Sequence, residues 1–138
     1  GADFVPKLEC EPGRGLVATS TSLLARVKLV RAEHGEVFLN DGIYGSLLEV
    51  AQAPALQPAY RVIRPGGTVA AEMRDFVVYG PTCDPLDRLP NRLRLPADLA
   101  EDDYLELGPI GAYGTATSTR FNGYGAAEVV TVEQTLGA

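Results

Sequence analysis

The sequence predicts a mainly β fold, namely a Greek-key-like β-barrel or sandwich domain with one or two short helices. Its 138 residues are enough for one domain with a real core. The 15 glycines and 10 prolines impose frequent turns, so regular segments must be short. Roughly seven or eight segments have strand character, at the close spacing that is typical of a sandwich or barrel.

The first half of the chain is expected to hold a helical turn and a β-hairpin. Residues 21–31 alternate apolar and polar side chains, as a half-buried strand does, so Ala25, Val27 and Leu29 are expected to face one side together. A turn over residues 33–35 leads into a second strand over residues 36–39. The flanking segments are an extended run over Phe4–Glu11, a brief helical turn over Gly15–Ser20, a loop over Asn40–Gly45 and a connector over Gln52–Pro58.

The second half is expected to supply the remaining strands, which lie between turns rich in glycine and proline. In the last of them, Val130 and Val132 would share one face. Residues 111–119 are rich in small side chains and indicate either a short helix or a loop that lets another group come close. The expected strands are Ala59–Arg64, one or two within Thr68–Tyr79, a short one at Arg92–Leu95, Tyr104–Leu107 and Glu128–Glu133.

Charge and composition argue against several classes of protein. The net charge is −6 and no block of basic residues occurs, which argues against a nucleic-acid-binding protein. No apolar run approaches the ~20 residues of a membrane span, and no segment resembles a signal peptide. Cys10 and Cys83 are too few for a disulfide scaffold; a bridge between them is possible, but a reducing cytoplasm is expected. One histidine, His34, in a predicted turn and two cysteines make no convincing zinc site.

Reactive side chains are most concentrated in GPTCDPLDRL, residues 80–89, which follows a strand-like run. A Gly-Pro turn is followed by Cys83 and Asp84, and Asp87 comes three residues later. A lone cysteine is more often an inert buried residue, but the polar turn around Cys83 favours a functional thiol that donates a proton or acts as a nucleophile. Asp84 suits recognition of a cationic group, and its alternative role is that of a solvated loop residue.

Other motifs are individually weaker. In EPGR, Glu11 and Arg14 form either a surface turn with an ion pair or a carboxylate and a guanidinium that face two ends of one ligand; the planar guanidinium suits a phosphate. In NDGIYG, Asp41 taken alone is a turn residue. In GAYG, Tyr113 is either a buried tyrosine or a phenol that donates to a phosphate. FNGYG, residues 121–125, is typical of a turn.

Five motifs together carry a resemblance to a known family. EPGR, NDGIYG, GPTCDPLD, GAYG and FNG occur in the order, and at roughly the spacing, found in the carboxy-terminal part of the ornithine/lysine decarboxylases. These enzymes depend on pyridoxal 5'-phosphate (PLP) and have the alanine-racemase-like fold type. The resemblance runs from about Phe4 to Glu133 and implies that residues 1–20 end a PLP-binding (β/α)8 barrel, while residues 21–138 form the C-terminal β-barrel domain.

The resemblance implies a role for each motif. Cys83 would protonate the carbanionic carbon after CO2 leaves, and Asp41 and Asp84 would bind the distal ammonium of a basic amino acid. A diaminopimelate decarboxylase usually has Glu-Ser after this cysteine, so Asp84-Pro85 points to a diamine-forming enzyme. The residues implied for the cofactor are Glu11 at the pyridine nitrogen, with Arg14 and Tyr113 at the phosphate.

The family also implies an assembly. Cys83 and Asp84 would reach into the active site of a partner subunit, so a head-to-tail homodimer is expected. The Schiff-base lysine of the family lies on the amino-terminal barrel, and the lysines of this sequence, Lys7 and Lys28, sit in no matching motif. We therefore expect this chain to be part of an enzyme, as a fragment, a separately expressed domain or one half of a split polypeptide.

The implied activity is decarboxylation of ornithine or lysine to a diamine and CO2, in polyamine biosynthesis. One alternative is a non-catalytic regulator of the same ancestry, of the antizyme-inhibitor kind. The retained cofactor and cysteine motifs argue against this alternative, and the missing barrel favours it. A second alternative is an unrelated β-barrel interaction module, which is what composition alone would predict.

Overall fold

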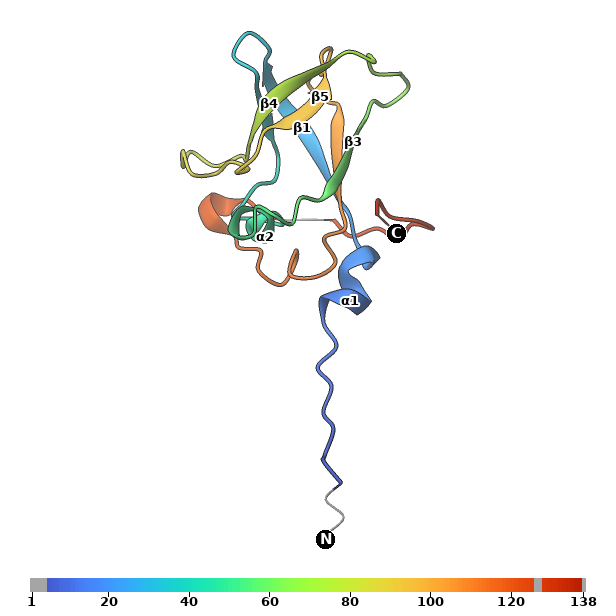
Figure 1. The fold of residues 1–138 in the computed structure, drawn as a ribbon. Helices are drawn as coiled ribbons and strands as arrows, with labels where there is room; N and C mark the ends of the chain where they lie inside the picture. The colour runs from blue at the N-terminus through green and yellow to red at the C-terminus, as the bar shows by residue number, and fades with distance from the viewer. Residues whose placement is uncertain (1–4, 126–127, 138) are drawn as a thin grey trace.

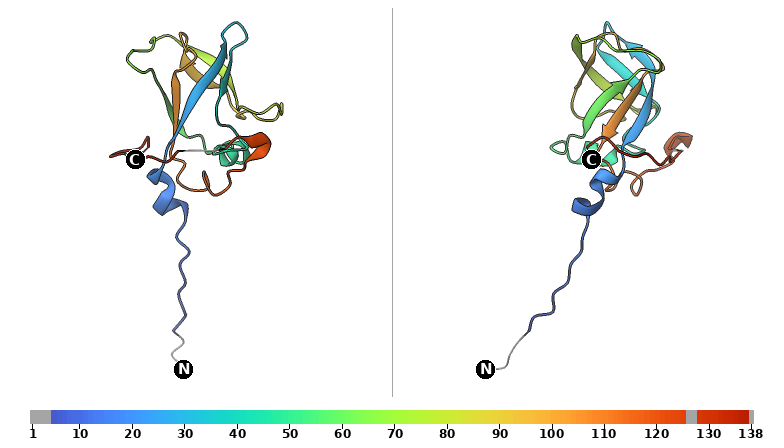
Figure 2. Two further views of the ribbon diagram at one scale, coloured as in Figure 1. Left: turned by 180° about the vertical axis from the view of Figure 1, so that it is seen from behind. Right: turned by 90° about the vertical axis from the view of Figure 1, so that its right-hand side faces the viewer.

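A six-stranded sheet curls into a nearly closed barrel in the computed structural model, which describes residues 5–125 and 128–137 (Figure 1; Figure 2). The spatial order of the strands is β3-β6-β1-β2-β4-β5, so neighbours in space are often distant in sequence, in agreement with the Greek-key-like expectation. The strands are β1 (Leu23–Arg31), β2 (Glu36–Leu39), β3 (Ala59–Ile63), β4 (Met73–Tyr79), β5 (Leu93–Pro96) and β6 (Tyr104–Gly108).

Pairing along the sheet is antiparallel except at one place. β1 and β2 form the predicted hairpin, whereas β2 and β4 run parallel, with Phe38 opposite Tyr79 and their rings stacked 4.9 Å apart. The two edge strands, β3 and β5, meet through the backbone N–H of Arg94, which donates to the Tyr60 hydroxyl at 3.1 Å. This contact brings the first and last strands of the sheet together, so the barrel is almost closed.

The core fills the barrel with alternate residues of its strands. Because successive side chains of a strand point to opposite faces, each strand sends every second residue inward. Burial of each Val, Leu or Phe side chain contributes roughly 1.5–3 kcal/mol relative to leaving it exposed. The buried residues of the strands are Ala25, Val27, Val37, Leu39, Phe76, Val78, Leu93, Leu95, Leu105 and Leu107.

Leu29 departs from the expected inward face of β1. Val27 pairs with Leu39 but Leu29 pairs with Phe38, so one extra residue lies in β1 at this point. Such a β-bulge changes which residues of the strand face the core. Leu29 is consequently 38% exposed, and Val30 packs against the core in its place. The prediction that Leu29 shares the face of Ala25 and Val27 was wrong.

The strand predicted over residues 128–133 is also wrong. Residues 128–133 are described and contain no strand, and Val129, Val130 and Val132 are exposed. Alternating valines have strand propensity, but a strand forms only where its backbone pairs with a neighbour. None of the described strand pairings includes this segment. The described part of the chain therefore holds six strands rather than seven or eight.

The helices and most of the motifs lie at one end of the barrel, which we call the motif end; it comprises α1, α2 and the loops 40–47, 80–88 and 109–125 (Figure 1). The predicted helical turn is present as α1 (Arg14–Val17) and the 3-10 helix η1 (Ala18–Ser20). The helix α2 (Leu48–Gln52) was not predicted, and η2 covers Phe121–Gly123. Residues 111–117 form turns, so the loop alternative for GAYG is correct.

Residues 5–13 lead away from the motif end without regular structure (Figure 2). The extended run expected over Phe4–Glu11 falls on this segment, and its first residue, Phe4, lies outside the described residues. The boundary expected after residue 20 stays a prediction. Over the described ranges, no helix is both long enough and apolar enough to cross a membrane.

Candidate functional site

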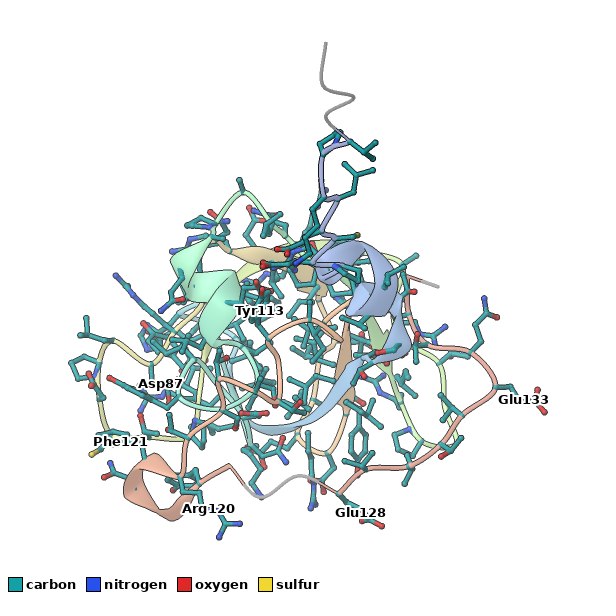
Figure 3. All side chains as sticks on the ribbon, turned by 90° about the horizontal axis from the view of Figure 1, so that it is seen from below. Asp87, Tyr113, Arg120, Phe121, Glu128 and Glu133 are labelled. Carbon is teal, nitrogen blue, oxygen red and sulfur yellow. The ribbon has the colours of Figure 1, made fainter. Side chains whose placement is uncertain are left out.

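Two groups of side chains occupy the motif end. The cysteine-loop cluster comprises Tyr44, Cys83, Asp84, Phe121 and Asn122, and the arginine cluster comprises Arg14, Glu49 and Tyr113. Figure 3 looks onto this end and places Asp87 and Phe121 on one side, with Tyr113 displaced towards α1 and α2. The structure therefore brings the predicted residues to the same end of the barrel but divides them between two groups.

The Asp84 carboxylate is fixed by two donors. The Tyr44 hydroxyl donates to Asp84 Oδ2 at 2.5 Å, and the backbone N–H of Leu86 donates to Oδ1 at 2.8 Å. These bonds, the Tyr44 bond first, hold the pKa of Asp84 below its ordinary value. The same contact raises the pKa of Tyr44. Asp84 is therefore an ionised, oriented carboxylate, not a free loop residue.

The FNGYG segment is part of this cluster, although its sequence indicated only a turn. The Phe121 ring lies 4.5 Å from the Tyr44 ring, and the Thr119 hydroxyl donates to the Tyr44 carbonyl at 2.7 Å. Asn122 Nδ2 lies 3.5 Å from Cys83 Sγ, in the geometry of a weak hydrogen bond. Cys83 is exposed at the surface of the cluster, and neither it nor Cys10 is in a disulfide. The possible Cys10–Cys83 bridge is absent.

Asp41 holds its own loop. Its carboxylate accepts the backbone N–H of Gly42 at 2.7 Å and that of Ser46 at 3.2 Å, so the turn role that the sequence indicated is present. Gly45 must lack a side chain, because a Cβ there would lie 1.7 Å from Asp41 Oδ1. Asp41 is half-buried and lines a shallow pocket with Tyr44, Asp87 and Phe121.

Asp87 joins the loop 40–47, which contains Asp41, to the loop 80–88, which contains Cys83. It is 1% exposed; its Oδ1 accepts the backbone N–H of Ile43 and its Oδ2 that of Thr82, each at 3.0 Å. A Cβ on either Gly42 or Gly80 would lie 2.2 Å from Oδ1. The sequence showed Asp87 as a second carboxylate of the motif but gave no sign that it is buried.

The arginine cluster is centred on Arg14, which donates from both terminal nitrogens to the two carboxylate oxygens of Glu49; the Nη1–Oε2 distance is 2.9 Å. Its guanidinium carbon lies 5.5 Å from the centre of the Tyr113 ring. The bonds to Glu49 raise the pKa of Arg14. The ion pair considered between Glu11 and Arg14 is thus replaced by one with Glu49, which no sequence signal had identified.

Tyr113 and Glu11 differ in their relation to this cluster. Tyr113 is 54% exposed and has a left-handed backbone, so the alternative of a buried tyrosine is wrong. Glu11 is exposed on the segment that leads away from the barrel, and none of the hydrogen bonds within the described residues includes its side chain. The structure therefore groups Arg14 with Tyr113 but leaves Glu11 apart.

The arginine cluster fits an anion such as a phosphate. A guanidinium has five N–H donors, and two of them serve Glu49, so three are left. The side chain is 38% exposed, which leaves the fork accessible at the barrel end. A phenol beside it adds a neutral donor. Residues 14 and 113 can thus hold the phosphate of a cofactor.

The region of the cysteine-loop cluster, in contrast, is acidic, because Asp41 and Asp87 lie beside Tyr44 and Phe121 of the cluster, which itself contains Asp84. None of the ion pairs within the described residues includes Asp41, Asp84 or Asp87. Backbone amides and a phenol satisfy the carboxylate oxygens but do not cancel their charge. The cluster is therefore suited to a cationic group.

Comparison with known proteins gives a consistent family. A profile of the pyridoxal-dependent decarboxylase C-terminal sheet domain matches residues 16–111. The ornithine decarboxylase of Schizosaccharomyces pombe is 33% identical over 130 residues, which are 87% of this chain and 30% of that protein.

Solved structures agree in fold. The arginine decarboxylase of Paramecium bursaria Chlorella virus, bound to agmatine, superposes with a TM-score of 0.73 at 30% identity, covering 84% of this chain and 31% of that one. The lysine/ornithine decarboxylase of Vibrio vulnificus, complexed with putrescine, gives 0.72 at 30% identity and covers 89% and 32%. The chain thus spans about a third of the length of the relatives that it matches.

Proposed function

This chain belongs to the C-terminal sheet domain family of the pyridoxal-dependent decarboxylases, and we propose that it completes an enzyme that converts ornithine or lysine to a diamine and CO2. Membership of this family overturns the alternative of an unrelated interaction module. The observation that carries the proposal is the acidic cluster without a cation, which lies beside the exposed thiol of Cys83. Polyamine biosynthesis in the cytoplasm is the corresponding setting.

On the substrate side, Asp84 and Asp41 bind the distal ammonium group. The Tyr44 hydroxyl keeps the Asp84 carboxylate ionised and oriented. Because Tyr44 is neutral, the negative charge of Asp84 is still available to a cationic substrate. An ammonium that leaves water without a partner costs several kcal/mol, so the carboxylates select substrates that carry the distal amine. Putrescine, with which the similar Vibrio vulnificus structure is complexed, carries the same kind of group.

Cys83 is the proton donor. Cys83 is exposed, and its Sγ accepts a weak hydrogen bond from Asn122 Nδ2. After CO2 has left, Sγ–H would donate its proton to the α-carbon of the substrate, and the resulting thiolate would take up a proton from solvent before the next turnover. General acid catalysis of this kind contributes typically ~10²–10⁴-fold in rate.

Arg14 and Tyr113 would hold the phosphate of PLP, and Glu11 would interact with its pyridine nitrogen. When bound, the cofactor supplies the electron sink that makes loss of CO2 possible. Glu49 holds the Arg14 fork in one orientation, so its remaining N–H groups are aligned before the phosphate arrives. Glu11 lies on the segment that leads away from the barrel, so its role requires that the cofactor lies beside this segment.

The separation of the two clusters supports a head-to-tail homodimer. In each active site, the arginine cluster of one subunit would meet the cysteine-loop cluster of the other. The amino-terminal (β/α)8 barrel, in the same polypeptide or in a separate one, supplies the Schiff-base lysine. Each site would thus combine three contributions, of which this chain provides two.

Native mass spectrometry of the assembled protein, followed by measurement of CO2 release from L-ornithine and L-lysine, tests the proposal. The expected result is a species that contains a PLP-loaded barrel and decarboxylates one of the two amino acids. Species without cofactor and without CO2 release would instead favour the non-catalytic regulator of the same ancestry. A PLP-loaded species that acts only on amino acids lacking a distal amine would contradict the substrate assignment.

A further inference from the structure

We propose that Asp87 is a positioning residue that sets the geometry of Cys83 and Asp84 by joining two loops through its buried carboxylate. The inference rests on the proposed function for its catalytic consequence but not for its structural basis. Asp87 is 1% exposed, and none of the ion pairs within the described residues involves it. A carboxylate buried at this depth without a cation must be held by hydrogen bonds, because desolvation otherwise disfavours its charge.

The hydrogen bonds of Asp87 come from two different loops. Oδ1 accepts the backbone N–H of Ile43, in the loop after β2, and Oδ2 accepts the backbone N–H of Thr82, in the loop after β4. The two donors are 39 residues apart in sequence. A carboxylate can accept from both at once, whereas an amide side chain has only one acceptor oxygen. The carboxylate is therefore the link that keeps the two loops in register.

Each donor directly precedes a residue of the cysteine-loop cluster. Thr82 precedes Cys83, and Ile43 precedes Tyr44, whose hydroxyl holds Asp84. The main chain of Asp87 reinforces the same loop, since its carbonyl accepts from Gly80 at 2.8 Å and its N–H donates to the Asp84 carbonyl at 2.9 Å. A shift of the carboxylate would thus reach the thiol through one loop and the substrate carboxylate through the other.

Two glycines make room for this arrangement. A Cβ on Gly42 would lie 2.2 Å from Asp87 Oδ1, and a Cβ on Gly80 would lie 2.2 Å from the same oxygen. Neither glycine has the left-handed backbone that would by itself require glycine. Their small size is needed because the carboxylate occupies the space between the loops. The glycines at positions 42 and 80 are therefore explained by the position of Asp87.

The test compares Asp87→Asn with Asp103→Asn in the assembled enzyme. Asp103 is 2% exposed, so its carboxylate is buried to the same degree as that of Asp87. It lies at the opposite end of the barrel, away from Cys83 and Asp84, and therefore serves as the control. We expect Asp87→Asn to lower kcat/KM by about 10–100-fold, since small displacements of catalytic groups cost up to ~10²-fold. We expect Asp103→Asn to lower the Tm but to change kcat/KM less than about twofold.

Double-mutant cycles separate positioning from general loss of structure. In an Asp84→Ala background, Asp87→Asn should no longer raise KM, and in a Cys83→Ala background it should no longer lower kcat. Effects that multiply fully in both backgrounds would overturn the proposal. Asp87→Glu keeps both acceptor oxygens but moves them by one methylene in a space closed by Gly42 and Gly80, so it should also lower kcat/KM. If neither Asp87 variant folds while Asp103→Asn does, Asp87 holds the whole domain and the proposal also fails.

Hydrogen exchange gives a measurement that does not depend on activity. Asp87→Asn should increase exchange about tenfold or more at the amides of Ile43 and Thr82, with the core strands unchanged. Unchanged exchange at these two amides would overturn the proposal even if activity fell. If the unsubstituted enzyme releases no CO2 from either amino acid, the proposed function fails, and the exchange data still decide whether Asp87 joins the loops.

Discussion

At the end of the barrel opposite the motif end, Arg64 bonds to two aspartates, whereas at the motif end Asp84 and Asp87 are held only by a phenol and backbone amides. Arg64 Nε and Nη2 donate to the two oxygens of Asp103 at 2.8 and 2.7 Å, and Nη1 donates to Asp98 at 2.8 Å. We call these three residues the arginine clasp. Both ends thus contain aspartates, but the partner is a guanidinium at one end and uncharged donors at the motif end.

The difference in partners indicates that the aspartates of the clasp stabilise the fold, whereas Asp84 at the motif end is suited to binding a ligand. Burial raises the pKa of Asp103, but Arg64 and the backbone N–H of Ala100 together outweigh burial and leave the pKa lowered. The backbone N–H of Ala70, followed by Arg64, lowers the pKa of Asp98. The Arg64 guanidinium offsets one of the two aspartate charges and ties residues 64, 98 and 103 together. At the motif end the charge of Asp84 is left available for a ligand.

Cys83→Ala is expected to have the largest effect on the motif end. Removal of the proton donor should lower kcat by about 10³-fold while PLP stays bound, because Cys83 makes none of the cofactor contacts. Steady-state kinetics and the PLP absorbance of the assembled enzyme measure the two quantities. Cys10→Ala, which removes the other exposed thiol, is the control. Unchanged turnover in Cys83→Ala would exclude the role assigned to this thiol.

Arg64→Met tests the other side of the comparison. The Asp103 side chain is 3% exposed, so loss of its cation leaves a buried charge without a partner. The free energy of unfolding should fall by about 3 kcal/mol, with little change in KM. Denaturant titration measures the fall. Arg26→Met removes an exposed ion pair with Asp102 and should cost less than about 1 kcal/mol. Equal costs in the two variants would contradict a special role for the clasp.

Tyr44→Phe removes the hydroxyl that holds Asp84 but keeps the ring against Phe121. We expect KM for the diamine-forming substrate to rise about fivefold, as befits one partly exposed hydrogen bond to a charged group. Thermal stability should be almost unchanged. Tyr104→Phe, on β6, is the matched control. A KM that rises equally in both variants would show that the Tyr44 hydroxyl does not orient Asp84.

The smallest expected effect is the acid dependence of stability. Asp98 and Asp103 have lowered pKa values in the folded state, so their contribution is complete above the unfolded aspartate pKa of ~3.9 and is lost as pH falls through the folded values. Unfolding free energies measured between about pH 7 and pH 3 should therefore fall at the acid end. Arg64→Met should show a shallower fall, and an identical slope would argue against the clasp as its source.

Local patterns predicted the elements better than the contacts. The alternation of apolar and polar residues correctly predicted the strand that contains Ala25 and Val27. The same pattern failed at Leu29, where a β-bulge turns the side chain away from the core. It also failed at Val130, because none of the described strands pairs with this segment. Helix α2 carries no strong periodic signal in its five residues. In the candidate site, the motifs identified Arg14 and Tyr113 as a pair, and the structure brings them together.

By itself, the sequence determined the mainly β character of the chain, its family and the residue types available for chemistry. Periodicity, turn residues and the order of motifs are properties of adjacent positions, so they can be read without a fold. Only the tertiary structure decided the partners: Glu49 for Arg14, Tyr44 for Asp84, and the amides of Ile43 and Thr82 for Asp87. These partners come from loops that meet only when the barrel closes, and closure depends on strand pairing over the whole chain.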